Sequence, residues 1–207
     1  MRHRVFAASL AAAAVLIGTP VLAVDPPNFD FNGYAIVPTT VGGALTVRTV
    51  LTNNGVVPTP IPLDFVNNQY TLVVTGTLAS QAGIFQYYSP ATLEIWEDPI
   101  AGGTAADYAN GGTFTDGTLI LSGAFDGNLT RTAFTAGLGS FLGLVDFSGG
   151  TRLGDLGTPS DWPFGGGWSR SVTTIPAGYH EQWDGKIDLA TVAVEDKTWE
   201  GLKRLYR

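Results

Sequence analysis

The stretch Leu45-Thr46-Val47-Arg48-Thr49-Val50-Leu51-Thr52 decides the fold, because it alternates between two faces of an extended strand. Every second residue from Leu45 to Leu51 points to one side, and those four residues are Leu, Val, Thr and Leu. Asn53-Asn54-Gly55 follows at once, and such a cluster is typical of a turn. Residues 69–80 alternate in the same way. The pattern predicts strands with one buried face.

Seven further stretches have strand-like composition and are separated by glycine, proline or asparagine. They are residues 29–36, 84–88, 92–97, 118–125, 128–134, 141–147 and 187–194. The chain contains 27 glycines and is rich in threonine, which favours pleated strands and turns over helices. We therefore predict an all-β fold, a jelly-roll-like β-sandwich of about nine strands.

The two ends of the chain differ from this pattern. Residues 1–23 combine a basic start, an Ala-rich apolar run and a small-residue site ending at Ala23, which is typical of a bacterial signal peptide. Residues 24–194 form the expected sandwich. Residues 195–207 read as a short amphipathic helix or tail with Trp199, Leu202 and either Leu205 or Tyr206 on one stripe. That segment either closes the domain or serves as a docking or sorting tail.

Composition excludes several classes of function. The chain has no cysteine, which removes disulfide scaffolds, thiolate metal sites and cysteine nucleophiles. Loss of Arg2 and Arg4 with the signal would leave nine basic and 18 acidic residues, a net charge of −9. A chain this acidic lacks the basic surface that nucleic acid requires. No second apolar run is long enough for a membrane-spanning helix, so we expect a secreted, periplasmic or cell-surface protein after signal cleavage.

An aromatic cluster in a glycine-rich stretch, residues 148–186, is the most informative candidate site. The residues that we predict to bind a ligand are Trp162, Trp168, Tyr179, Glu181, Gln182 and Trp183. Flat rings beside carboxylates and amides suit a sugar, whose C–H face stacks on a ring while its hydroxyl groups find polar partners. The alternative is that these rings seal the end of the sandwich. A binding platform requires at least two of the rings to be exposed and roughly coplanar.

The sequence supports a catalytic or metal site less than it supports the aromatic cluster. Glu97 with Asp98, or Glu181 with Asp184, could form the paired carboxylates of a glycoside hydrolase, but solvated acids at turns explain them equally well. His180 is the only histidine after the signal, and no Gly-x-Ser-x-Gly motif accompanies it. We identify no catalytic residue, metal ligand or cofactor.

Calcium is the one metal that the composition leaves open. The best local clusters are 126–128 and 184–188, and neither matches a calcium-loop pattern. The Asp-Gly pair in each cluster is first of all a turn dipeptide.

These observations lead to a ranked expectation. The first is an exported, non-enzymatic protein of the cell surface or extracellular matrix with a structural or adhesive role. The second is a carbohydrate-binding module that uses the aromatic loop, with a glycan or another cell-envelope component as partner. A carboxylate-dependent glycoside hydrolase comes last. The oligomeric state is left open by the sequence.

Overall fold

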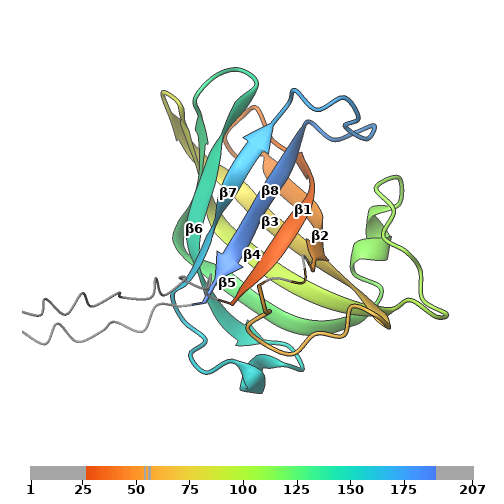
Figure 1. The fold of residues 1–207 in the computed structure, drawn as a ribbon. Helices are drawn as coiled ribbons and strands as arrows, with labels where there is room; N and C mark the ends of the chain where they lie inside the picture. The colour runs from red at the N-terminus through yellow and green to blue at the C-terminus, as the bar shows by residue number, and fades with distance from the viewer. Residues whose placement is uncertain (1–26, 54, 56, 190–207) are drawn as a thin grey trace, which may run out of the picture.

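The computed structural model describes residues 27–53, 55 and 57–189 (Figure 1). The predicted signal peptide, residues 1–23, and the predicted C-terminal helix, residues 195–207, lie outside the described residues.

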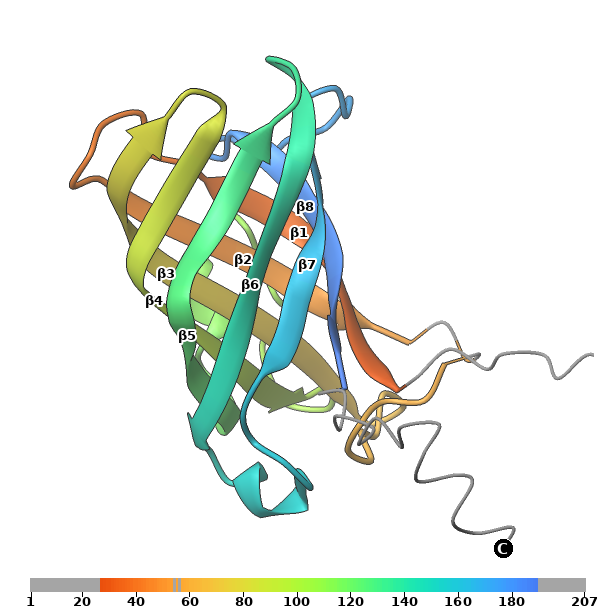
Figure 2. The ribbon, with the colours of Figure 1, turned by 90° about the vertical axis from the view of Figure 1, so that its left-hand side faces the viewer.

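In the described part of the chain, eight strands make up almost all of the regular structure. They are β1 (Asn28–Ile36), β2 (Ala44–Thr52), β3 (Asn68–Ala82), β4 (Phe85–Pro99), β5 (Thr118–Ala133), β6 (Leu138–Gly149), β7 (Trp162–Ser169) and β8 (Glu181–Asp188). Each strand pairs antiparallel with the next, and β8 pairs with β1, so the sheet closes into a barrel (Figure 2). Two short 3-10 helices, η1 (Gly111–Phe114) and η2 (Leu153–Asp155), lie in the connections.

The all-β prediction is confirmed, but the predicted sandwich is wrong because the sheet closes on itself. The glycine-rich stretch expected to be irregular contains β7 and most of β8, the two strands that complete the closure. Two pairs of the nine predicted strands merge, which leaves seven, and β7, which was not predicted, is the eighth. The last predicted strand, 187–194, overlaps β8 only at its end. The stretches 84–88 and 92–97 are one strand, β4, and the stretches 118–125 and 128–134 are one strand, β5.

Irregular pairing explains why the merged strands looked separate. In β4, Pro90 lies where the register with both neighbouring strands shifts, which is where a proline without an N–H group is tolerated. In β5, Gly127 has φ +70° inside a register shift of the β5–β6 pairing. The Asp126-Gly127 pair therefore marks a bulge within a strand rather than a turn between strands.

Alternation along the strands separates an apolar interior from a polar outer surface. In β1, Phe29 and Phe31 are fully buried, whereas Asp30 and Asn32 between them are only partly covered. Aromatic rings fill much of the interior. Phe141 and Trp183 stack with ring centroids 4.0 Å apart, and Phe31 stacks on Phe164 at 5.2 Å. An interior this full is expected for a small barrel whose side chains meet across its axis.

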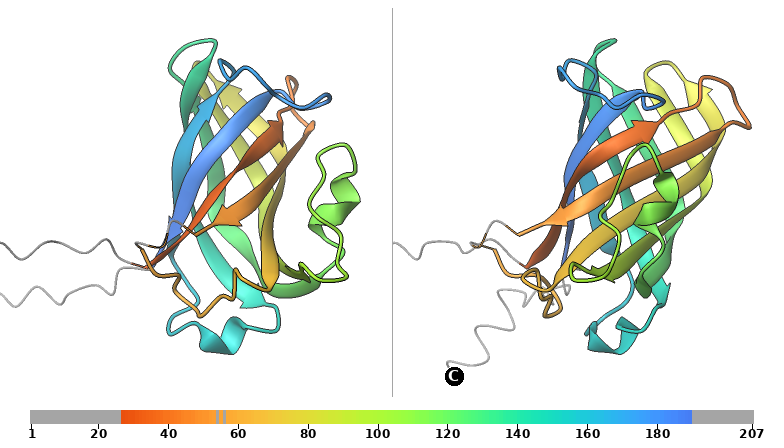
Figure 3. Two further views of the ribbon diagram at one scale, coloured as in Figure 1. Left: turned by 45° about the vertical axis from the view of Figure 1, so that its right-hand side comes forward. Right: turned by 90° about the vertical axis from the view of Figure 1, so that its right-hand side faces the viewer.

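The barrel has two unlike ends, which we define here. The upper end, at the top of Figure 1, consists of the connections 37–43, 83–84, 134–137 and 170–180. The lower end consists of the described residues of 53–67 together with 100–117 and 150–161. The connection 100–117 turns back over the outer surface, and the Thr71 hydroxyl of β3 donates to the Phe114 carbonyl at 2.7 Å (Figure 3). In the part of the chain that the structure describes, no helix has the length and apolarity needed to cross a membrane.

Candidate functional site

The six residues predicted to bind a ligand lie close together, but most of them face the barrel interior. Trp162, Trp168 and Trp183 point inward from β7 and β8 with exposed fractions of 3% or less, and Tyr179 is 9% exposed. Burial of this kind leaves no ring face on which a sugar could stack. The aromatic residues act as core, which is the alternative reading that their sequence pattern left open.

The remaining two predicted residues are separated by the barrel wall. Glu181 is fully buried inside, whereas Gln182 points outward and donates to the Asn32 side chain at 3.0 Å. Adjacent residues in a strand must face opposite sides, and the same rule separates Glu181 from Asp184, which bonds to Asn32 on the outer surface. The structure therefore does not bring Glu181 and Asp184 together as a carboxylate pair.

A buried ion pair lies inside the upper end of the barrel. Arg131 of β5 donates from Nε to Glu181 Oε1 at 2.8 Å and from a terminal nitrogen to Oε2 at 2.7 Å. Arg170 and the indole N–H of Trp183 also donate to this carboxylate, at 3.2 and 2.8 Å. Both carboxylate oxygens are thus fully engaged. Such an arrangement holds a charge in place and leaves no lone pair directed at a substrate.

The groups around Arg131 complete this buried network. Its other terminal nitrogen donates to Gln86 Oε1 at 3.0 Å, and its guanidinium carbon lies 3.6 Å from the centre of the Trp168 ring. The Tyr88 hydroxyl donates to the same oxygen of Gln86 at 3.2 Å. Burial raises the pKa of Tyr88 far above its ordinary value, so its hydroxyl stays neutral and able to donate. These contacts fill the upper end of the barrel interior.

The other catalytic and metal candidates are accounted for by local contacts. His180 is exposed, and its Nδ1 accepts the Val37 backbone N–H at 3.0 Å. Glu97 accepts the Tyr70 hydroxyl at 2.7 Å, while Asp98, on the opposite face, accepts the Thr104 backbone N–H at 3.0 Å. Among the described residues no three His, Asp or Glu side chains converge as a metal site would require.

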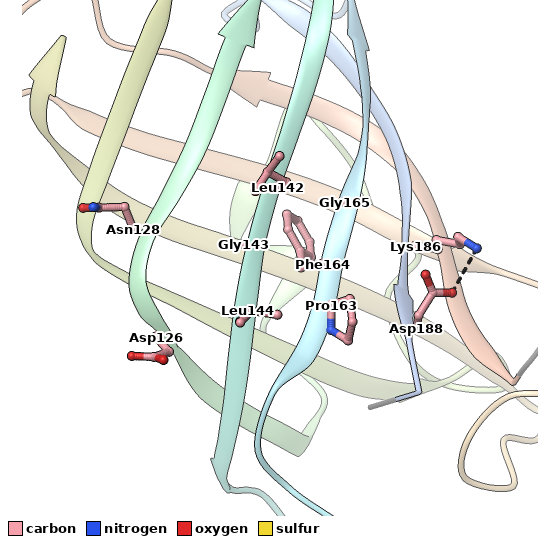
Figure 4. A pocket seen from close by; sticks show the side chains of 10 residues that line it. All are labelled: Asp126, Asn128, Leu142, Gly143, Leu144, Pro163, Phe164, Gly165, Lys186 and Asp188. Atoms are coloured by element: carbon pink, nitrogen blue, oxygen red, sulfur yellow. Dashed lines mark ion pairs between the residues drawn. The ribbon is translucent and has the colours of Figure 1, made fainter. Parts of the chain in front are cut away.

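A hollow of the described surface lies on the outside of the barrel, along β7 (Figure 4). It has a volume of about 500 Å³ and spans strands β5 to β8. The side chains that form its walls are Asp126, Asn128, Leu142, Leu144, Lys186 and Asp188, and Pro163 and Gly165 of β7 lie between them. A second hollow of 300 Å³ follows farther along β7, beside Gly167, Ser169, Gln182 and Asp184. We call these two hollows together the β7 groove.

Glycine creates the β7 groove. The outward positions of β7 are Pro163, Gly165, Gly167 and Ser169, so this strand carries no long side chain on its outer face. Longer side chains on the neighbouring strands form two walls of different chemistry. Leu142 of β6 is 58% exposed, and Lys186 and Asp188 of β8 form an ion pair at 3.0 Å.

The β7 groove was not predicted, although the sequence contains two signals for it. The expected strand 141–147 has leucines at positions 142 and 144, opposite the buried residues Phe141 and Val145, so both of its faces are apolar. Glycines at 165 and 167 are two residues apart, which places them on one face of a strand. An outward leucine pair beside an outward glycine pair is the pattern that indicates a groove.

The fold and these sites define a class, an up-and-down antiparallel barrel of eight strands with a filled interior and a groove on its outer wall. Comparison of the chain with protein-family models, with curated proteins and with solved structures gives no match.

Proposed function

We propose that the chain is an exported, non-enzymatic protein of the cell surface or extracellular matrix, and that it holds a glycan chain of the cell envelope in the β7 groove. The observation that carries the proposal is the contrast between the two sides of the barrel wall. Inside, the charged groups Arg131 and Glu181 bind each other. Outside, 500 Å³ of accessible space lies between unlike walls.

The lining of the β7 groove supports a sugar as ligand. The exposed leucines Leu142 and Leu144 offer an apolar surface to the C–H face of a pyranose ring. Polar groups lie on both sides of these leucines, with Asp188 of β8 across the groove and Asp126 and Asn128 on β5 (Figure 4), and they can bond to hydroxyl groups. Export, which the N-terminal sequence predicts, would place the groove where such chains occur.

The enzymatic alternative has less support. A glycoside hydrolase needs two carboxyl groups facing one another at about 5–10 Å across a cleft that admits the scissile bond. In the β7 groove, Asp188 is paired with Lys186 and Asp184 accepts a hydrogen bond from Asn32 at 2.7 Å. These carboxylates are positioned by neighbours on the surface, which suits holding a ligand.

The test is a glycan-array and whole-cell binding assay with residues 24–207 and a variant that fills the groove. Gly165→Val suits this purpose, because a Cβ atom added at Gly165 meets only the Phe141 carbonyl oxygen, at an ordinary 3.5 Å. The control is Thr75→Val on β3, which places the same valine side chain at an exposed position on another part of the outer wall, with a hydroxyl group replaced by a methyl group.

We expect Gly165→Val to weaken binding about tenfold or more, since it occupies volume that the ligand needs, and Thr75→Val to leave binding unchanged. Equal binding by both variants would place the site elsewhere. Failure of the parent protein to bind any cell or glycan would remove the adhesive function. Release of shortened saccharides on incubation would overturn the non-enzymatic part of the proposal.

A further inference from the structure

Large apolar side chains project from three of the four connections at the upper end and from the strand residues that directly follow two of them, Phe85 of β4 and Leu138 of β6. The set is Val41, Ile84, Phe85, Phe134 and Leu138, and all of them are at least 40% exposed. The hairpins that carry them rise beside one another at the top of Figure 2. Exposed apolar residues scattered singly need no explanation, but a group at one end of a molecule indicates a contact surface.

Backbone hydrogen bonds join these connections into one rim. The Ala133 N–H donates to the Ile84 carbonyl at 2.9 Å, which ties the β5–β6 hairpin to the β3–β4 hairpin. The Arg170 N–H donates to the Gly137 carbonyl at 2.8 Å and joins the β7–β8 connection to the same rim. The apolar tips are therefore held in fixed relation to one another.

The charge of the upper end is opposite to that of the whole chain. No Asp or Glu occurs in residues 37–43, 83–84, 134–137 or 170–180, although the complete chain has 18 acidic residues. Glu181, which directly follows the connection 170–180, is fully buried and paired with both Arg131 and Arg170. The Arg170 side chain remains 46% exposed, so the upper end carries a net positive charge.

The lower end also exposes apolar side chains, but acidic residues lie beside them. Val66 and Ile100 are also exposed there, at 84% and 59%. However, Asp64 lies two residues before Val66, and Asp98 lies two residues before Ile100. An anionic surface would attract the upper end and repel the lower end.

We propose that the upper end docks on the surface of a lipid bilayer that contains anionic phospholipids. Phe134, Ile84 and Phe85 enter the boundary between headgroups and acyl chains, and Arg170 lies near the phosphate groups. Apolar groups buried at this depth, together with basic side chains near an anionic surface, are what peripheral membrane binding requires. This proposal does not depend on the glycan proposed for the β7 groove, which lies on the side wall of the barrel.

A bilayer fits this surface better than another protein does. The apolar side chains sit on separate hairpins and loops, whereas a protein interface has a contiguous apolar core inside a polar rim. Contact between the upper ends of two copies would also bring the two Arg170 side chains together, and like charges at a contact oppose association.

The experiment is co-sedimentation of residues 24–207 with vesicles of phosphatidylcholine alone and of phosphatidylcholine with phosphatidylglycerol. The test variant is the double change Ile84→Ser and Phe134→Ser, both at exposed tip positions. Val66→Ser is the matched control, because it removes an exposed apolar side chain from the lower end. A third variant, Phe134→Trp, places a fluorescent ring at the tip; its emission should shift to the blue on binding.

We expect binding to the anionic vesicles that weakens at high salt, a loss of about tenfold or more in the double variant, and no loss in Val66→Ser. Absence of binding by the parent protein would overturn the proposal, as would an equal loss in Val66→Ser. If the double variant instead abolishes self-association seen by size-exclusion chromatography while vesicle binding is absent, the upper end is an interface between copies and the bilayer is ruled out.

Discussion

The two ends of the barrel interior are closed by different chemistry. At the lower end, Trp162 packs against Phe29 and Phe147, with ring centroids 6.2 and 5.6 Å apart. At the upper end, the same role falls to the Arg131–Glu181 ion pair. Apolar packing loses stability in proportion to the atoms removed, whereas a buried ion pair fails as a unit when either partner is lost. The two ends should therefore respond very differently to small changes.

The largest effect is expected from Arg131→Met. Removal of the guanidinium leaves the Glu181 carboxylate buried with Arg170 as its one cationic partner among the described residues, and breaking a buried pair in this way costs about 3–5 kcal/mol. Urea unfolding followed by circular dichroism measures the loss as a lower transition midpoint.

Two comparisons sharpen this result. Phe147→Leu at the lower end retains an apolar side chain and should cost only about 1–2 kcal/mol. The double variant Arg131→Met with Glu181→Leu removes both charges and should recover most of the loss. A double variant as unstable as Arg131→Met alone would show that packing around Trp168, and not the unpaired charge, dominates the upper end.

The next largest loss of stability is expected for a change at Gly166 of β7, which lies between the two ends. Gly166 faces inward, and a Cβ atom there would lie 2.2 Å from the Asp184 carbonyl oxygen and 2.6 Å from the Phe141 ring. Gly166→Ala should therefore cost about 1–3 kcal/mol through forced displacement of the neighbouring strand.

Its neighbour Gly165 faces the β7 groove, where a Cβ atom meets no contact shorter than 3.5 Å. Gly165→Ala should leave the thermal midpoint within about 2 °C of the parent. If both variants lowered the midpoint equally, strand β7 would need glycine for a reason other than the space on its two faces.

The two ends should also differ, by a smaller amount, in how their buried tyrosines affect stability at alkaline pH. Burial raises the pKa of Tyr88 at the upper end far above its ordinary value. Burial, followed by the hydrogen bond to Glu97, also raises the pKa of Tyr70 at the lower end. The folded chain keeps these protons at a pH where the unfolded chain has released them. Their contribution to stability is complete below about pH 10 and falls as the pH rises further, by up to about 1.4 kcal/mol per pH unit for each proton.

Tyr88→Phe should therefore flatten the fall in stability between about pH 10 and 11.5 more than Tyr70→Phe does, because Tyr88 carries the larger shift in pKa. The measurement is the urea midpoint of each variant as a function of pH. Identical slopes for the parent protein and Tyr88→Phe would mean that the Tyr88 hydroxyl ionises only after unfolding by another route.

The sequence was sufficient to predict the strands in which apolar and polar residues alternate. It was not sufficient to predict the strands that close the barrel. Strand β2 was predicted within one residue because its inward Leu and Val alternate with Thr and Arg. Strand β7 was missed because glycines occupy both faces near its centre, which removes the contrast on which the prediction depends. Without β7 and β8 the remaining strands form an open sheet, so a sandwich was the natural inference.

The candidate site shows the same limit. The sequence places Trp168, Glu181 and Trp183 in one stretch of the chain, and in the structure all three contact Arg131 or one another, but the sequence could not say which side of the wall each would face. Their partner Arg131 lies 50 residues before Glu181, on a strand that only barrel closure brings near. A contact of this kind depends on the register of the whole sheet, which no local pattern contains.

The smallest expected effect comes from Glu97→Gln at the lower end. The Tyr70 hydroxyl donates to Glu97 at 2.7 Å and accepts the Asp64 backbone N–H at 2.9 Å, so it links β4 to the connection before β3. An amide oxygen still accepts this bond, and only the benefit of the charge is lost, which corresponds to about 1 kcal/mol in unfolding experiments. Glu94→Gln is the control, because Glu94 lies on the outer wall of the same strand, where solvent screens its contact with Trp96. A loss for Glu97→Gln as large as that for Arg131→Met would mean that both ends depend on a charge held inside the barrel, and the contrast between them would disappear.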